Sequence, residues 1–343
     1  MQRVVHEPRP DWQAKVEAVG FRFHTIPGQG GVYWDEAGHW SLTAAEIDHL
    51  ETATEELYGL CMQAAEAIVR EKRYAALGIP PQAVPAIERS WERRGAASGF
   101  ELYGRLDLAW TGGSAPPKLL EYNADTPTGL FEAAVVQWQW LEEWNEATGR
   151  DDDQFNSIHE KLSARWAAFA ASDGAPEALH LTCHAPHPED EGTVEYIAAA
   201  AVEAGLAVKA LAIQDIGWMD RGAAGGQFVD LENEPIQALF KLYPWEFMVQ
   251  EEFGARLIAE VARGRIAVIE PAWKMLLSNK AILAVLWEMF PRHPNLCEAH
   301  LDGSAFKREA RVVAKPFLGR EGANISIATI DRTGAPKDLE EGT

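Results

Sequence analysis

Cysteine is scarce in this chain of 343 residues, and the sequence has no long hydrophobic run. The three cysteines, Cys61, Cys183 and Cys297, lie far apart and show no CxxC or Cys/His spacing, so neither a zinc site nor a disulfide framework is indicated. No apolar run approaches the length of a membrane span, and the first residues, MQRVVHEPRPDW, lack the apolar core of a secretory leader. We therefore expect a cytoplasmic protein without membrane contact.

Basic residues are outnumbered by acidic ones. Lysine and arginine total 31 against 52 aspartates and glutamates, which gives a formal net charge of −21. A field of this sign repels nucleic acid and anionic lipid, so neither is expected as a partner. It would attract a cationic molecule such as a polyamine, although an acidic surface also simply keeps a protein soluble. Nothing in the sequence indicates an oligomeric state.

The order of the predicted elements indicates an α/β (α+β) protein. A capping box that starts at Thr43 begins a long amphipathic helix, which should end before Gly78. Residues 99–125 predict a β-hairpin, and Thr126 and Pro127 then look like the N-cap and first turn of a further helix.

A middle segment follows a different pattern. Within 176–270, strands alternate with helices as in a βαβ unit, and the polar stretch HPEDEG is predicted as a loop after the first strand. After it come a helix, two strands joined by GREGAN, and a polar end, APKDLEEGT, without a closing element. We therefore divide the chain into a helical and hairpin part (1–175), a Rossmann-like subdomain (176–270) and a lid part (271–343).

The predicted hairpin has one polar face. Side chains of a strand alternate between its two faces, so a symmetric loop that pairs Trp110 with Lys118 places Asp107 opposite Glu121. Two carboxylates that face each other across a sheet repel, so a cation is expected between or above them.

Both a metal site and an ordinary solvated face fit this hairpin. Arg105, opposite Asn123 in the same register, could partly neutralise the carboxylates, but oxygens of Asp107, Glu121 and Asn123 would suit Mg²⁺ better. A helix N-terminus at Thr126–Thr128 would offer N–H groups to an anion. Together these features suggest metal-bridged phosphates.

The segment GREGAN could hold phosphates or be a simple turn. Gly319 and Gly322 would let backbone N–H groups curl around phosphate oxygens, with Lys315 just before them and Arg320 between them. Lys280 starts an apolar helix, where the helix dipole disfavours a cation, so it has either a functional role or a snorkelling side chain.

Three acidic residues follow the first strand of the middle segment. Loops at the carboxyl ends of such strands bind ligands, so Glu189 and Asp190 could hold an ammonium-bearing substrate. A solvated run of charge is the other interpretation.

Three segments, LLEYNADTPTGLFEAAVVQW, EPAWKMLLSNKAILAVLWEMFP and VVAKPFLGREGANI, resemble the glutathionylspermidine synthase family. The resemblance implies an ATP-grasp fold with an inserted Rossmann-like pre-ATP-grasp subdomain. It also implies an ADP-forming ligase that uses ATP and Mg²⁺ to join a thiol peptide, such as glutathione, to a polyamine through an acyl phosphate.

The resemblance assigns roles to the residues singled out above. Arg105 would stabilise the transferring phosphoryl group as the catalytic arginine. The implied metal ligands are Asp107, Glu121 and Asn123. The ATP contacts would be Lys280, Lys315 and Arg320, with Gly319 and Gly322 in the same loop. The substrate contacts would be Thr126, Thr128, Glu189 and Asp190.

Two departures from the family pattern shape the functional hypotheses. Family members continue past the GREGAN hairpin, and bifunctional members carry an amidase domain, so we expect a fragment, truncated at its C-terminus, that covers synthesis alone. A ligase of the same family with a different amine or peptide is one alternative. A protein that binds ATP or substrate without turnover is the other.

Overall fold

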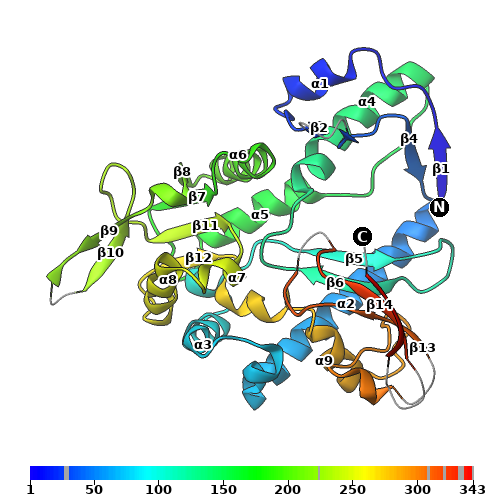
Figure 1. Cartoon of the computed structure of the whole chain (residues 1–343). Coiled ribbons are helices and arrows are strands. Elements are labelled where there is room, and N and C mark those ends of the chain that lie inside the picture. The colour runs from blue at the N-terminus through cyan, green and yellow to red at the C-terminus, as the bar shows by residue number, and fades with distance from the viewer. Residues whose placement is uncertain (27–30, 223–224, 307–309, 320–321, 331–335, 342–343) are drawn as a thin grey trace.

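The computed structural model describes residues 1–26, 31–222, 225–306, 310–319, 322–330 and 336–341. Helices and strands are interleaved, so the chain is an α/β protein as predicted (Figure 1). The α-helices are α1 (Trp12–Ala18), α2 (Ala44–Glu71), α3 (Val84–Glu92), α4 (Gln137–Thr148), α5 (Ile158–Ala170), α6 (Pro188–Glu203), α7 (Trp245–Met248), α8 (Glu252–Ala262) and α9 (Ile282–Met289). None of the helices in this described part of the chain combines the length and apolar character that crossing a bilayer requires.

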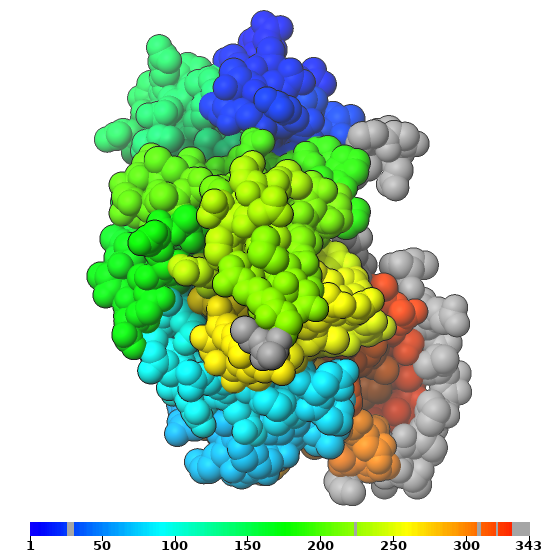
Figure 2. All heavy atoms as spheres, turned by 90° about the vertical axis from the view of Figure 1, so that its left-hand side faces the viewer, coloured from blue at the N-terminus to red at the C-terminus, as the bar shows by residue number. Residues whose placement is uncertain are grey.

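The β-strands form several small sheets. They are β1 (Gln2–Val5), β2 (Thr25–Ile26), β3 (Gly31–Val32), β4 (Gly38–Ser41), β5 (Arg105–Ala109), β6 (Lys118–Asn123), β7 (Ala178–Cys183), β8 (Ala207–Ala212), β9 (Gly217–Asp220), β10 (Gly226–Val229), β11 (Ala238–Leu242), β12 (Ala267–Ile269), β13 (Ala310–Ala314), β14 (Ser326–Ile330) and β15 (Pro336–Glu341). Seen from the side of the β9–β10 hairpin, the first residues lie at one end of the molecule and α3 lies toward the other (Figure 2).

The long helix α2 supports the β5–β6 hairpin. The predicted capping box is present, because the Thr43 side chain accepts the N–H of Glu46 and the Glu46 carboxylate accepts the N–H of Thr43. α2 ends at Glu71, before Gly78 as predicted. Its buried stripe shares one hydrophobic core with α9 and with Tyr122 of β6. One face of the hairpin is thereby buried, and the opposite face carries the polar side chains.

The predicted βαβ unit is part of a parallel sheet with the strand order β12–β11–β7–β8. Successive residues of β11 face opposite sides, as strand geometry requires. Phe240 packs in the same core as Ile197 of α6, whereas Leu239 packs in the core that contains Leu257 of α8. Helices therefore cover both faces of the sheet, which Figure 1 shows with α5 and α6 on one side and α8 on the other.

The polar stretch HPEDEG is not a loop. α6 begins at Pro188, and the N-cap His187 accepts the N–H of Asp190 through its ring nitrogen. Glu189 and Asp190 therefore lie in the first helical turn, where the helix dipole stabilises carboxylates. The loop prediction was wrong because a run of acids looks like a solvated connection, although it is also favourable at a helix start.

The helix after the hairpin begins later than predicted. Thr126 lies in a bend, Pro127 follows it without helical structure, and the helix starts at Leu130. Gly129 has a φ of +82°, a left-handed value that does not fit inside an α-helix. A π-helical turn, Glu132–Val136, then leads into α4. The N–H groups of Thr126 and Thr128 are therefore not those of a helix end.

Two corrections apply near the C-terminal end. β13 and β14 pair on either side of GREGAN as predicted, but β15 then pairs with β14 where no closing element was expected. Lys280 lies in the turn before α9 rather than in the helix, and its backbone N–H donates to the carbonyl of Phe317 at 2.8 Å. The β13–β14–β15 sheet and the β5–β6 hairpin approach each other in Figure 1, and Lys315 contacts Leu120 between them.

Candidate active site

Polar side chains from both strands of the hairpin share one face, and the predicted register is confirmed at its centre. Arg105 pairs with Asn123, and Asp107 pairs with Glu121. Arg105 Nε donates to Asp107 Oδ1 at 2.9 Å, and Asn123 Nδ2 donates to Glu121 Oε1 at 3.3 Å. All four side chains are partly exposed or exposed, so this face can be reached from solvent.

The register shifts beyond Asp107, so the predicted pairing of Trp110 with Lys118 is wrong. Lys118 pairs with Ala109 instead, because Leu120 is inserted into β6 as a bulge. The carbonyl of Leu120 accepts a hydrogen bond from Lys315 at 3.0 Å. The bulge thus places a backbone acceptor where the β13–β14–β15 sheet meets the hairpin.

Lys280 joins the hairpin face from the turn before α9. Its Nζ lies 2.9 Å from Glu121 Oε2 and donates to the carbonyl of Gly319 at 2.7 Å. Burial of Glu121 works against its ionised form, but the hydrogen bond and charge of Lys280 outweigh this and hold the pKa of Glu121 below its ordinary value. The Glu121 carboxylate is therefore ionised at neutral pH.

Lys315 brings a second ammonium group to the same place. Burial lowers the pKa of Lys315; the charge of Glu121 opposes this shift, and the charge of Lys280 adds to it. Asp107 also acts on Lys315 through its charge. Two lysines and two carboxylates thus lie within electrostatic reach of one another.

A second group of polar residues lies on the other side of Arg105. Arg105 Nη1 donates to the Thr128 carbonyl at 2.9 Å, and the Thr128 hydroxyl hydrogen-bonds the Glu189 carboxylate. Burial, followed by the charges of Glu132 and Asp190, raises the pKa of Glu189. Residues from β5, from the segment after β6 and from α6 therefore converge here.

The remaining predicted site residues are Thr126, Gly319, Gly322 and Arg320. Thr126 is partly buried in the bend that follows β6. A Cβ added to Gly319 would lie 2.9 Å from Pro316 Cγ, so this position suits glycine, and Gly322 has a left-handed φ of +75°. Arg320 lies outside the described residues.

A buried ion pair that the sequence did not reveal fixes the end of β6. Lys241 of β11 and Asp125 form an ion pair at 2.5 Å, and their side chains are 0% and 3% exposed. The other carboxylate oxygen of Asp125 accepts the N–H of Trp245 at 2.7 Å, and the Asp125 N–H donates to Ser278 Oγ at 2.8 Å. The only signal in the sequence was a lysine inside the apolar strand QALFKL. This pair ties the parallel sheet to the hairpin.

The hairpin face has the donors that Mg²⁺ prefers. Among the described residues, no group of three or more His, Cys, Asp or Glu side chains forms a ready metal cage. Asp107, Glu121 and the amide of Asn123 nevertheless lie on one face, and Mg²⁺ commonly takes one or two carboxylates together with water and phosphate oxygens. This small oxygen set fits such an ion.

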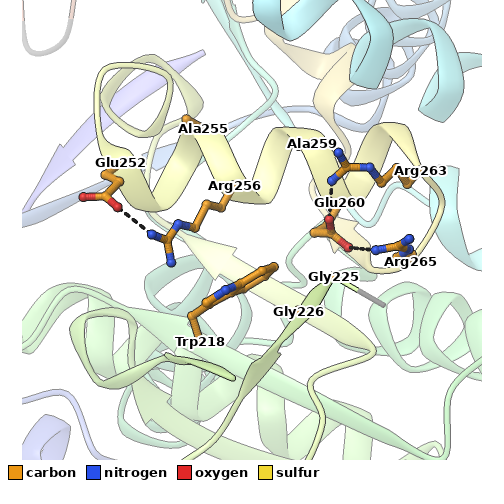
Figure 3. A pocket seen from close by; sticks show the side chains of 10 residues that line it. All are labelled: Trp218, Gly225, Gly226, Glu252, Ala255, Arg256, Ala259, Glu260, Arg263 and Arg265. Carbon is orange, nitrogen blue, oxygen red and sulfur yellow. Dashed lines mark hydrogen bonds and ion pairs between the residues drawn. The ribbon is translucent and has the colours of Figure 1, made fainter. Parts of the chain in front are cut away.

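A separate cavity of about 490 Å³ lies between α8 and the β9–β10 hairpin (Figure 3). Its guanidinium groups are paired: Arg256 with Glu252 at 2.6 Å, and both Arg263 and Arg265 with Glu260. None of the predicted site residues lines it. Because the residues predicted to bind ATP and metal lie elsewhere, we assign this cavity no role in phosphate binding.

Known proteins match this chain along most of its length. It is 40% identical over 329 residues to the "Putative acid--amine ligase" of Haemophilus influenzae, covering 95% of this chain and 80% of that protein. It is 26% identical to the bifunctional glutathionylspermidine synthetase/amidase of Escherichia coli over 86% of this chain, and 26% identical to the trypanothione synthetase of Crithidia fasciculata over 81%. It spans only 48% and 44% of those two proteins. The profile described as "Glutathionylspermidine synthase preATP-grasp" matches residues 3–341, so this chain belongs to that family.

Proposed function

We propose that this protein is an ATP-dependent ligase that joins a carboxylate to an amine through an acyl phosphate. The observation that carries the proposal is the meeting of Asp107, Glu121 and Lys280 on one face, from segments far apart in the chain. Membership in a family whose relatives are named as synthetases and as an acid–amine ligase supports it. On the proposed division of the chain, the site would lie where parts 1–175 and 271–343 meet.

The charges on the face match a nucleotide phosphate chain with its metal. Arg105, Lys280 and Lys315 are three cations against the carboxylates Asp107 and Glu121, which leaves one net positive charge. Phosphate oxygens would replace the present acceptors of the two lysines, which are a carboxylate and backbone carbonyls.

The released carboxylates would then be free for the metal. Asp107, Glu121 and Asn123 would hold Mg²⁺, which when bound neutralises phosphate charge and polarises the transferring group. Opening of the Lys280–Glu121 ion pair on ATP binding follows from this exchange of partners.

The proposed reaction proceeds in two steps, in which first ADP and then phosphate is displaced. A carboxylate oxygen of the peptide attacks the γ-phosphorus of ATP, ADP leaves, and an acyl phosphate forms. The neutral amine then attacks the carbonyl carbon, the C–O bond to phosphate breaks, and the nitrogen loses a proton to give an amide. Arg105, held beside Asp107 and Thr128, is positioned to orient the substrate carboxylate and to offset charge on the transferring group.

Glutathione or a related thiol peptide is the proposed acid, and spermidine or a related amine is the proposed nucleophile. Thr126 and Thr128 would contact the peptide, whereas Glu189 and Asp190 would attract the cationic amine. A family ligase with another amine or peptide is the alternative. We place the reaction in the cytoplasm, where ATP and reduced thiols are available.

ADP release provides the test. The purified chain would be mixed with ATP, Mg²⁺ and glutathione, with and without spermidine. Release that depends on spermidine supports the proposal, release with other amines alone favours the related ligase, and ATP binding without release favours a binding protein. Glu121→Ala should abolish release, and Glu51→Ala, an exposed residue on α2, should not. Full activity of Glu121→Ala would remove the site assignment.

A further inference from the structure

Glu132 is a buried carboxylate that the proposed chemistry does not yet use. It lies in the π-helical turn after Gly129, and only 6% of the residue's surface is exposed. Its Oε1 accepts the hydroxyl of Tyr33 at 2.6 Å, whereas its Oε2 is buried without a hydrogen-bond partner among the described residues. A buried carboxylate oxygen without a hydrogen bond lowers the stability of the fold, so a contribution to stability does not explain the presence of Glu132. π-Helical turns are also frequent at functional sites.

Other carboxylates gather around this residue. Glu132 is the first charged group, after burial, among the causes that raise the pKa of Glu189, and Asp190 is the next. Asp190 lies in the first turn of α6, with its Oδ2 3.4 Å from Nδ1 of His187. Like charges brought together in a partly buried place destabilise the protein unless a cation joins them.

This group of acidic residues lies next to the hairpin face that we propose binds the phosphates of ATP. Thr128 links the two, because its carbonyl accepts from Arg105 and its hydroxyl hydrogen-bonds Glu189. Arg105 is itself engaged by Asp107, so it does not neutralise the acids. A cation bound here would therefore be held beside the carbon atom that the amine attacks.

We propose that Glu132, positioned by Tyr33, receives a protonated amino group of the amine substrate through its Oε2, together with Glu189 and Asp190. This inference rests on the proposed function and adds its amine specificity. A primary ammonium group donates up to three hydrogen bonds, which suits three converging carboxylates. The substrate is thus a di- or polyamine, with one amino group neutral for attack and another charged for recognition.

Glu132→Gln is the decisive variant, because it keeps the size of the side chain and an oxygen for Tyr33 but removes the charge. The KM for spermidine should rise about tenfold or more, while the KM for ATP and glutathione and the kcat stay within about twofold. Glu132→Asp should restore part of the affinity. Glu146→Gln, on the exposed side of α4, removes one carboxylate elsewhere and should change nothing.

Two further readouts separate this inference from the proposed function. Hydroxylamine, which is uncharged at neutral pH, traps the acyl phosphate as a hydroxamate. The rate of hydroxamate formation should be the same in Glu132→Gln as in the wild type. Calorimetric titration with spermidine reports amine binding even if no turnover occurs. Equal spermidine affinity in wild type and Glu132→Gln, no measurable affinity in either, or a matching loss of hydroxamate formation in the variant would overturn the inference. Tm should not fall, since the substitution relieves repulsion among the carboxylates.

Discussion

Replacing Lys280 by methionine removes the ammonium group that links the turn before α9 to the hairpin face. Its Nζ lies 2.9 Å from Glu121 Oε2, and the side chains of Lys280 and Glu121 are 9% and 25% exposed. Solvent screens this pair less than it screens a surface pair. We therefore expect Lys280→Met to lower the free energy of unfolding by about 1–2 kcal/mol at neutral pH. For a chain of this size, that corresponds to a fall in Tm of about 1–3 °C.

The loss should depend on pH. Burial alone would raise the pKa of Glu121, yet Lys280 keeps it below its ordinary value of 4.5. A carboxylate with a lowered folded-state pKa stabilises the protein above its unfolded-state pKa, and this contribution is lost as the pH falls through the folded-state value. The advantage of the wild type over Lys280→Met should thus be full at neutral pH and shrink below pH 4.5.

Lys315→Met is the matched control, since it also removes one lysine ammonium group from the hairpin face. Lys315 donates to a backbone carbonyl and is repelled by Lys280, so its loss should cost less stability. Both variants should raise the KM for ATP about tenfold or more, because each takes one cation from the phosphates. Urea unfolding and steady-state ADP release measure the two effects. Equal losses of stability, or an unchanged KM for ATP in both variants, would refute the reasoning.

Three other substitutions test separate parts of the site. Lys241→Met leaves Asp125 buried without its ammonium partner and should cost about 3–5 kcal/mol in urea unfolding; a loss under about 1 kcal/mol would contradict the structure. Arg105→Lys keeps the charge but not the fork that reaches both Asp107 and Thr128, so kcat should fall about a hundredfold with little change in the KM for ATP, and an unchanged kcat would argue against its role. Asp107→Asn should raise the Mg²⁺ concentration for half-maximal activity about tenfold, and an identical Mg²⁺ titration would remove it from the metal site.

The centre of the hairpin face was predictable because its pattern is local. Strand side chains alternate between two faces, so Arg105 and Asp107 share a side, and antiparallel pairing brings Glu121 and Asn123 opposite them. The bulge at Leu120 was not predictable, because alternation carries no signal for one inserted residue. It shifted the pairing on the loop side of the hairpin by one residue and left the central pairs unchanged.

Contacts between residues that lie far apart in the sequence could not be predicted from it. Asp125 and Lys241 are ordinary charged residues in the sequence, and only the fold shows that they neutralise each other in the interior. Glu132 carries no signal in the sequence that separates it from the other acidic residues. It is buried in a π-helical turn that follows the left-handed Gly129, and neither feature could be predicted from the sequence. The start of α6 was missed because a capped first turn and a solvated loop favour the same acidic residues.

Transfer of an isotope from the acid to phosphate tests the acyl-phosphate mechanism most directly. Glutathione carrying ¹⁸O in its glycine carboxylate would be supplied with ATP, Mg²⁺ and spermidine, and the inorganic phosphate released would be analysed by mass spectrometry. Because the carboxylate oxygen attacks phosphorus and leaves with it, each phosphate should carry one ¹⁸O atom, formed together with one ADP and one amide. Phosphate that contains no ¹⁸O while amide accumulates, or label that appears in AMP, would contradict the account.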